Sequence, residues 1–199
     1  MLIIARAIAK VLQEQKVDVY LSDPAWENCR LARMDGLKSY FGNPQSAQAE
    51  RFLPMSNLKT LIGLSPNRHN NALGVQYFSH ILEEKNVYSL KSSSAHSKAN
   101  KDSLTFLSRQ NLFGENASYS VLSSLVAKGG KVSATKLAEA FNWENYLEVN
   151  KEAIPLFVLQ HFDEEDYVRV IPFTVGGEYV PDVGDMIIAM QPPKVTILK

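Results

Sequence analysis

The first 90 residues alternate short β-type runs with segments of helical periodicity, and this alternation constrains the fold more than any other feature. Ile4, Ile8 and Leu12 recur at helical spacing, so a first helix should end near residues 15–16. Strands are then predicted at 17–21, 37–41, 58–64 and 87–90, with helices at 26–35, 46–52 and 68–84. Strands alternating with helices are typical of right-handed parallel units. We therefore expect an α/β lobe with a Rossmann-like parallel sheet and flanking helices.

The second half of the chain has a different pattern. Residues 91–103 are polar and have no periodicity, and we interpret them as a linker between lobes at 1–90 and 104–199. A helix around 119–126, a strand at 131–135 and helical turns at 137–141 and 146–147 are predicted next, followed by apolar β-type runs at 154–160, 167–174 and 185–191. An acidic turn at 163–166 and a glycine pair at 176–177 separate these runs, which predicts a smaller α+β lobe with an antiparallel sheet.

Composition excludes several classes of protein. The chain has 199 residues with 21 basic and 21 acidic side chains, so its overall charge favours neither nucleic acid nor an anionic membrane surface. Its apolar stretches are far shorter than the roughly 20 residues of a membrane-spanning helix. The only cysteine, Cys29, allows no internal disulfide, and the start of the chain lacks the features of a secretory signal. We expect a soluble, cytoplasmic protein.

Asp23 is the first candidate ligand-binding residue. In dinucleotide-binding units, an acidic side chain that closes the second strand accepts hydrogen bonds from ribose hydroxyls, and Asp23 follows the predicted strand at 17–21. Asp23 could equally cap the helix that Pro24 opens, and the two roles are compatible. The glycine-rich phosphate turn is absent before the first helix, because the first glycine is Gly36. A phosphate site is therefore formed in another way or lost.

A second candidate site is the loop at 65–71, just past the carboxyl end of the strand predicted at 58–64. Open parallel sheets bind ligands at this edge. Ser65 begins the loop, Asn67 and Asn71 could reach a base or ribose, and Arg68 could reach a phosphate. In the alternative interpretation, Asn67 caps the following helix and Arg68 is solvated.

No sequence motif predicts a reaction centre or a metal site. Tyr-x-x-x-Lys, G-x-S-x-G and G-x-x-x-x-G-K-[ST] are all absent. His80 and Glu84 stand four residues apart on a predicted helix, but they lack a third ligand and are expected to be a solvated pair. The acidic run at 163–166 is expected to be a charged hairpin tip, and Cys29 a buried thiol. We predict no catalytic residue and no metal ligand.

Several short motifs in residues 5–90 together resemble one protein family. They are Ala5 to Leu12, Leu21-Ser22-Asp23 with Trp26-Glu27-Asn28, Ala32-Arg33-Met34, Tyr40-Phe41-Gly42-Asn43, and Leu64-Ser65-Pro66-Asn67 with Asn71-Ala72-Leu73. In order and spacing they resemble the cytoplasmic tail of bacterial NhaP-type sodium/proton antiporters, which carries a Rossmann-like domain similar to the TrkA-N or RCK domains. The resemblance continues more loosely through 112–114, 137–143 and 155–157.

The resemblance implies a regulatory domain rather than an enzyme. Such a domain binds NAD or another adenine nucleotide, forms a homodimer and biases the transmembrane antiporter core, at the cytoplasmic face of the inner membrane. The ligand-binding residues expected are Asp23, Pro24, Trp26, Asn43, Ser65, Asn67, Arg68 and Asn71. Two alternatives stay open: an NAD-dependent oxidoreductase of unusual type, and a structural assembly tail that binds no ligand.

Overall fold

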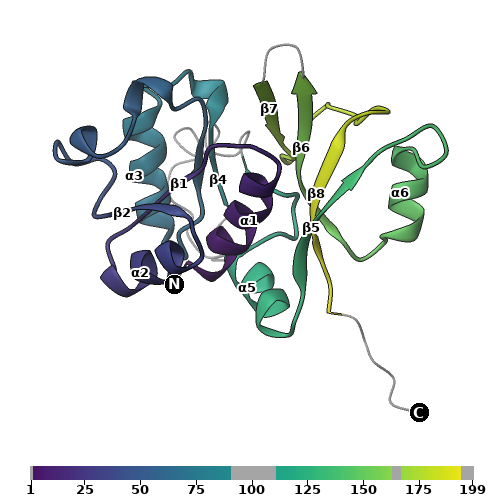
Figure 1. Ribbon diagram of the computed structural model, residues 1–199, viewed down its shortest axis with the longest axis horizontal. Helices are drawn as coiled ribbons and strands as arrows, with labels where there is room; N and C mark the ends of the chain where they lie inside the picture. The colour runs from purple at the N-terminus through teal and green to yellow at the C-terminus, as the bar shows by residue number, and fades with distance from the viewer. Residues whose placement is uncertain (1, 91–110, 163–166, 194–199) are drawn as a thin grey trace, which may run out of the picture.

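The computed structural model describes residues 2–90, 111–162 and 167–193, and these form a mixed α/β protein (Figure 1). The α-helices described are α1 (Ile3–Glu14), α2 (Trp26–Met34), α3 (Arg68–Phe78), α5 (Tyr119–Ala127) and α6 (Trp143–Val149). The strands are β1 (Tyr20–Asp23), β2 (Lys38–Phe41), β3 (Leu61–Gly63), β4 (Val87–Ser89), β5 (Lys131–Lys136), β6 (Ile154–Phe162), β7 (Tyr167–Pro172) and β8 (Met186–Gln191). Short 3₁₀ helices are η1 (Ala49–Arg51), η2 (Met55–Asn57) and η3 (Glu84–Asn86). No described helix has both the length and the apolar character needed to span a membrane.

The first 90 residues contain two parallel strand pairs. β1 pairs with β2 and β3 pairs with β4, and α2 and α3 provide the respective connections. The parallel strands and their helical connections agree with the sequence pattern. Within the described residues, however, no ladder joins the β1–β2 pair to the β3–β4 pair. A single Rossmann-like sheet therefore stays a prediction.

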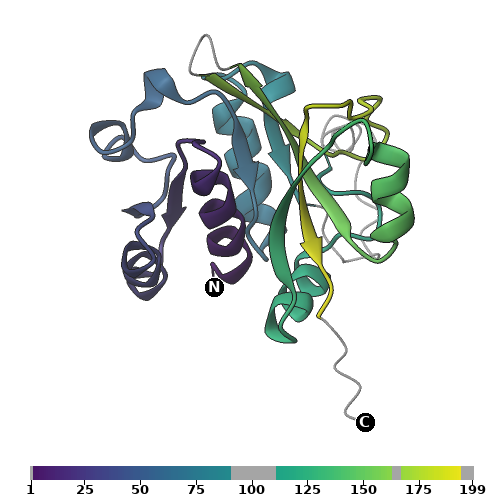
Figure 2. The ribbon, with the colours of Figure 1, turned by 45° about the vertical axis from the view of Figure 1, so that its right-hand side comes forward.

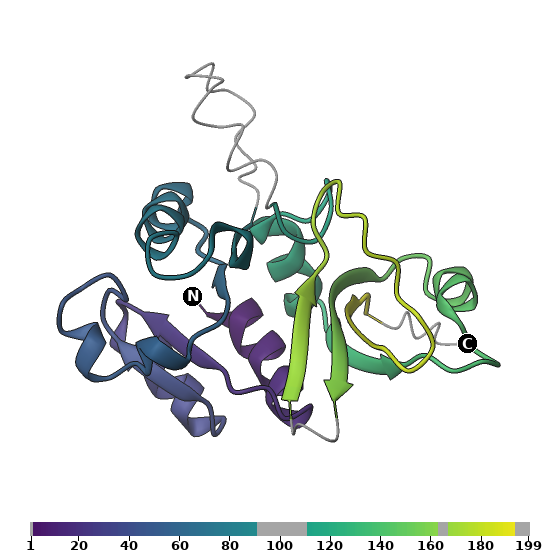
Figure 3. The same ribbon diagram turned by 90° about the horizontal axis from the view of Figure 1, so that it is seen from above.

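The second half forms a four-stranded antiparallel sheet in the order β5-β8-β6-β7, which confirms the predicted antiparallel sheet. Alternate residues of its central strand β8 face opposite sides, as a strand requires. Ile187 lies in a cluster with Tyr146 of α6, whereas Ile188 lies in a cluster with α1 and α5. Figure 3 shows the sheet from above, with α6 beside it.

Helix α1 joins the two halves into one hydrophobic core. Ile4, Ile8 and Leu12 belong to a buried cluster that also contains residues of the antiparallel sheet, among them Leu156 and Ile188. Figure 2 shows α1 between the β1–β2 pair and the four-stranded sheet. A helix that is apolar towards two neighbours is expected to be buried between them. One hydrophobic core therefore contains residues from both predicted lobes, 1–90 and 104–199. The predicted linker at 91–103 lies outside the described residues.

Helix α2 ends as its sequence indicates. Gly36 has a positive φ of 77°, and its N–H bonds the carbonyl of Arg33, while Leu37 N–H bonds that of Ala32. This is the left-handed glycine cap expected after the helix. Cys29 of α2 is a fully buried thiol, as predicted, and burial is the main cause that raises its pKa.

Several predicted element boundaries were wrong. The helix predicted at 46–52 is only η1, and the helix predicted at 68–84 ends at Phe78. Residues 137–141 form a turn closed by a bridge between Ala138 and Phe141 instead of a helical turn. The first strand begins at Tyr20 rather than Val17, because Val17 N–H still bonds the carbonyl of Leu12 at the end of α1. Tertiary contacts override local propensity in such short segments.

Candidate functional site

Asp23 lies at the carboxyl end of β1 and fixes the entrance to α2. Its Oδ1 accepts hydrogen bonds from Ala25 N, at 2.7 Å, and from Asn28 Nδ2, at 2.9 Å. The prediction that Asp23 caps a helix opened by Pro24 was wrong, because the N-cap of α2 is Ala25 and no side chain caps it, so Asp23 and Pro24 belong to the turn before the helix. Within the described part of the chain, Oδ2 has no hydrogen-bond partner. One carboxylate oxygen is therefore structural, and the other is the oxygen that a ribose hydroxyl could meet.

Tyr119, the first residue of α5, lies near Asp23 although it belongs to the second half of the chain. Partial burial raises the pKa of its hydroxyl, and the negative charge of Asp23 raises it further. Sequence reasoning missed this residue as a site candidate. The sequence around Tyr119 indicates only the start of a helix, which Ser118 caps by accepting the N–H of Val121. No local pattern indicates that Asp23, so distant in sequence, lies near it.

The amino end of α1 lies at the same edge of the strand pairs. Leu2, at its N-cap, packs in a cluster with Leu21 of β1 and with Leu64, which follows β3. No side chain caps this end of the helix, and its first turn carries no acidic residue. Uncapped N–H groups and the helix dipole favour an anion at this position. These N–H groups are donors of the kind that the absent glycine turn would supply.

The loop at 65–71 is held by its own side chains. The buried Asn71 accepts from Ser65 N at 2.9 Å and donates to Ser65 O at 2.9 Å. Ser65 Oγ accepts from Asn67 N, and Asn67 Oδ1 accepts from His69 N, which confirms that Asn67 caps α3. Arg68 is exposed on the first turn of that helix. The predicted polar residues therefore lie together, but the side chains of Ser65, Asn67 and Asn71 bond the backbone of the loop itself.

The remaining site candidates lie near the ends of β1 and β2. Asn43 is exposed and its Oδ1 accepts the N–H of Gln45. The indole of Trp26, 53% exposed, meets the edge of the Phe41 ring at 5.6 Å, and the Arg33 guanidinium lies 5.2 Å from its centroid. The two rings are nearly perpendicular, at 83°, and the guanidinium lies over the indole, so the pair does not form an open flat surface for a base.

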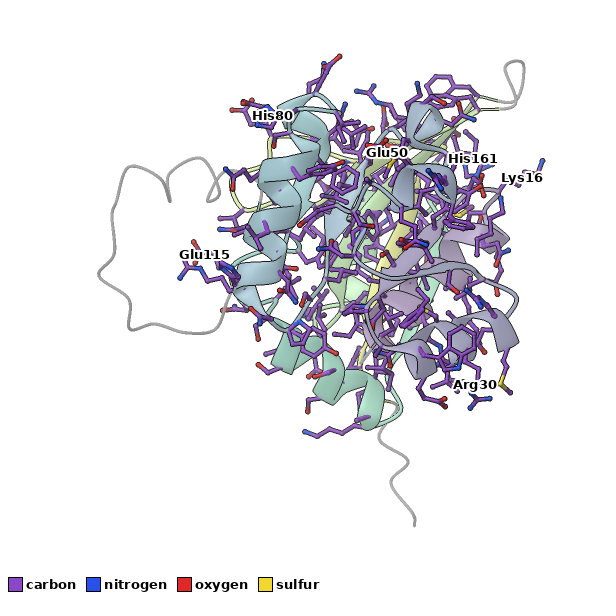
Figure 4. The ribbon with its side chains drawn as sticks, turned by 90° about the vertical axis from the view of Figure 1, so that its left-hand side faces the viewer. Lys16, Arg30, Glu50, His80, Glu115 and His161 are labelled. Carbon is purple, nitrogen blue, oxygen red and sulfur yellow. The ribbon has the colours of Figure 1, made fainter. Side chains whose placement is uncertain are left out.

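No group of three potential metal ligands occurs among the described residues. The prediction that His80 and Glu84 share one helix was wrong, since α3 ends at Phe78 and Glu84 begins η3. Figure 4 shows His80 at the end of α3 and Arg30 at the opposite end of the view. The acidic run at 163–166 lies outside the described residues.

A shallow cavity of about 390 Å³ lies away from this edge, before the starts of β3 and β4. It is lined by Met55, Ser56, Leu58, Lys59, Ile81, Leu82, Glu83 and Asn86. The pKa of Glu83 is lowered by its hydrogen bond to Lys85, so its carboxylate has no proton to give near neutral pH. The predicted ligand residues do not line this cavity.

A polar network in the second half was also missed by sequence reasoning. The buried Asp185 accepts from the Tyr179 hydroxyl at 2.6 Å and from Gln160 Nε2 at 3.2 Å. Partial burial is the main cause, and the hydrogen bond to Asp185 the second, that raises the pKa of Tyr179 to about 12. Tyr179 is therefore protonated near neutral pH and is a weaker acid than an ordinary tyrosine, and the network ties the segment before β8 to β6.

Comparison with known proteins does not extend the assignment. No known family model matches the chain, and no curated protein is significantly similar to it. Membership of the NhaP-type antiporter family therefore stays a prediction that rests on the short motifs alone.

Proposed function

We propose that the chain is a ligand-sensing regulatory domain that binds an adenine nucleotide at the carboxyl edge of β1 and β3. The main observations are that the charge of Asp23, at the end of β1, acts on the Tyr119 hydroxyl, and that Leu2, at the uncapped amino end of α1, packs with Leu21 of β1. Such a site offers an acceptor for ribose, an aromatic surface and partial positive charge for phosphate.

Regulation follows from the position of α1. Its amino end lies at the proposed nucleotide site, and its apolar side contacts the sheet of the second half. A nucleotide that binds two arrangements of α1 with different affinity would shift the equilibrium between them. The resemblance to antiporter tails supports a transmembrane cation/proton antiporter core, at the cytoplasmic face, as the partner that responds.

A homodimer is part of this proposal. Large apolar side chains are exposed around α2 and β2, namely Trp26, Met34, Phe41 and Phe52. Exposed apolar surface of this kind often marks a protein interface, and two-fold dimers are the commonest closed assembly. Sedimentation at micromolar concentration should show a dimer, and a monodisperse monomer would contradict this part of the proposal.

Calorimetric titration with NAD, NADH, ATP and AMP tests nucleotide binding. Asp23→Asn keeps an oxygen for the Ala25 N–H but replaces the second oxygen by an NH₂ group, so affinity should fall about tenfold, roughly 1.4 kcal/mol. Asn28→Ala is the matched control, because it removes a structural hydrogen bond to Asp23 and leaves Oδ2 unchanged. Equal affinity in Asp23→Asn and the unchanged protein would contradict the ribose contact.

A structural assembly domain without a ligand is the second candidate. Its support is that the side chains of Asp23, Asn43, Ser65, Asn67 and Asn71 already hold local backbone. If none of the four nucleotides binds, this candidate moves ahead. Everted vesicles that contain an NhaP-type antiporter separate the two candidates. A sensing domain should change proton exchange only when nucleotide is present, whereas an assembly domain should change it without nucleotide.

A further inference from the structure

The cavity before the starts of β3 and β4 has an apolar floor that the fold holds in place. Met55 and Leu58 reach it from the segment before β3, and Leu82 reaches it from the segment before β4. Because the two strands are parallel, both segments lie at the same edge of the pair. All three side chains pack against the buried cluster that α3 and β4 form. The floor is therefore formed before any ligand binds, as is usual for ligand pockets.

Ile81 adds an exposed apolar side chain to the same cavity. It follows His80, which Figure 4 labels at the end of α3, and it is 44% exposed. With Ile81, half of the side chains that line the cavity are apolar. The volume of about 390 Å³ falls near the lower end of the roughly 300–1,000 Å³ that is typical of ligand pockets. The cavity thus has the size and the apolar surface for a small molecule with an apolar body.

The rim of the cavity carries one positive charge that no described group neutralises. Lys59 is exposed and has no ion pair or hydrogen bond within the described residues. Glu83, the only carboxylate among the lining residues, is already paired with Lys85 at 2.6 Å. The partly buried side-chain amide of Asn86 also has no hydrogen-bond partner in the described ranges. One free cation beside one free amide donor suits a monoanion, and the described lining contains no arginine for a phosphate.

We propose that this cavity binds a small carboxylate with an aliphatic body. The carboxylate would accept hydrogen bonds from Lys59 and from the Asn86 amide at the rim, while the aliphatic body covers Ile81 and the floor. Binding would remove exposed apolar surface from water and neutralise the free cation, so both parts of the ligand contribute. The inference does not rest on nucleotide binding, because the cavity and the loop at 65–71 lie at opposite ends of β3.

Titration of the full chain with octanoate, followed by two-dimensional NMR of the backbone amides, tests the proposal. An open site for so small a ligand should bind weakly, with a Kd on the order of 1 mM. The amide signals of residues 55–59 and 81–86 should shift and saturate, whereas those of β6 should not shift. Octanol has an alkyl chain of the same length without the charge, so it should bind about fivefold more weakly.

Two variants separate the charge from the apolar surface. Lys59→Gln keeps most of the side chain and removes its charge, so octanoate should bind about fivefold more weakly while the affinity for octanol is unchanged. Lys128→Gln is the matched control, because Lys128 is also an exposed lysine, at the end of α5. Ile81→Ala should weaken both ligands equally. Its control is Leu147→Ala on α6, where Leu147 is 43% exposed, and this variant should weaken neither ligand.

Three results would overturn the proposal. Equal octanoate affinity in Lys59→Gln and Lys128→Gln would show that Lys59 does not meet the carboxylate. Octanol binding as tight as that of octanoate would leave only an apolar contact, without recognition of an anion. Shifts that are absent, or that saturate only outside residues 55–59 and 81–86, would show that the cavity does not bind such a ligand.

Discussion

The replacement of Asn71 by alanine tests how the loop at 65–71 is held. The side chain is 7% exposed, and its amide makes two hydrogen bonds of 2.9 Å to the backbone of Ser65. Alanine leaves a half-buried N–H and C=O of Ser65 without these partners. Each hydrogen bond contributes about 1 kcal/mol net, and an unsatisfied group costs about 1–3 kcal/mol. We expect Asn71→Ala to lower the free energy of unfolding by about 2–3 kcal/mol.

Urea unfolding followed by far-ultraviolet circular dichroism measures this loss. Asn70→Ala is the matched control, because Asn70 is an exposed neighbour in the same helical turn and alanine changes its helix propensity equally. Its effect should stay within about 0.5 kcal/mol. If Asn71→Ala is no less stable than Asn70→Ala, the amide does not hold the loop. A loss of nucleotide affinity without a loss of stability would instead give Asn71 a direct role in binding.

Three further predictions concern the core, a helix cap and pH. Ile8→Ala removes a buried side chain of α1 and should cost about 2–5 kcal/mol, and the strand pairs of the first half and the four-stranded sheet should still unfold in one urea transition. Gly36→Ala should cost about 1 kcal/mol in thermal unfolding because φ is +77°, whereas Gly74→Ala, inside α3 with ordinary contacts, should be neutral or stabilising. The pKa of Tyr179 is raised in the folded chain, so its stabilising contribution is complete below pH 10 and is lost as pH rises from 10 to about 12. Tyr179→Phe should remove that part of the alkaline loss of stability, and an unchanged difference in unfolding free energy between pH 9 and pH 12 would contradict the raised pKa that burial and the Asp185 hydrogen bond give Tyr179.

The sequence predicted the elements whose signals are local. The helical spacing of Ile4, Ile8 and Leu12 identified α1, and the glycine at 36 marked the end of α2. The strands of the antiparallel sheet were identified from continuous β-type runs between turn residues. In each case the periodicity and the terminal signal lie within one short segment, so no tertiary information was needed.

Long-range contacts could not be predicted in the same way. The charge of Asp23 acts on Tyr119 across the two halves because α5 packs beside α1, and no pattern near residue 119 indicates this proximity. The Tyr179–Asp185 hydrogen bond depends on how the segment before β8 folds back onto β6. The separation of β1 from β3 was also not predicted, because the period of a strand does not specify its neighbour.

The position of α1 has a consequence for any attempt to divide the molecule. A cut between residues 90 and 111 separates a first fragment that carries Ile4, Ile8 and Leu12 from a second that carries their partners on β6 and β8. Each fragment would expose the apolar surface that the other fragment covers in the intact chain. Neither fragment should therefore be soluble and well ordered by itself. The two should instead reassemble when they are expressed together, so the chain is suited to fragment complementation, with the apolar side of α1 as the surface that drives reassembly.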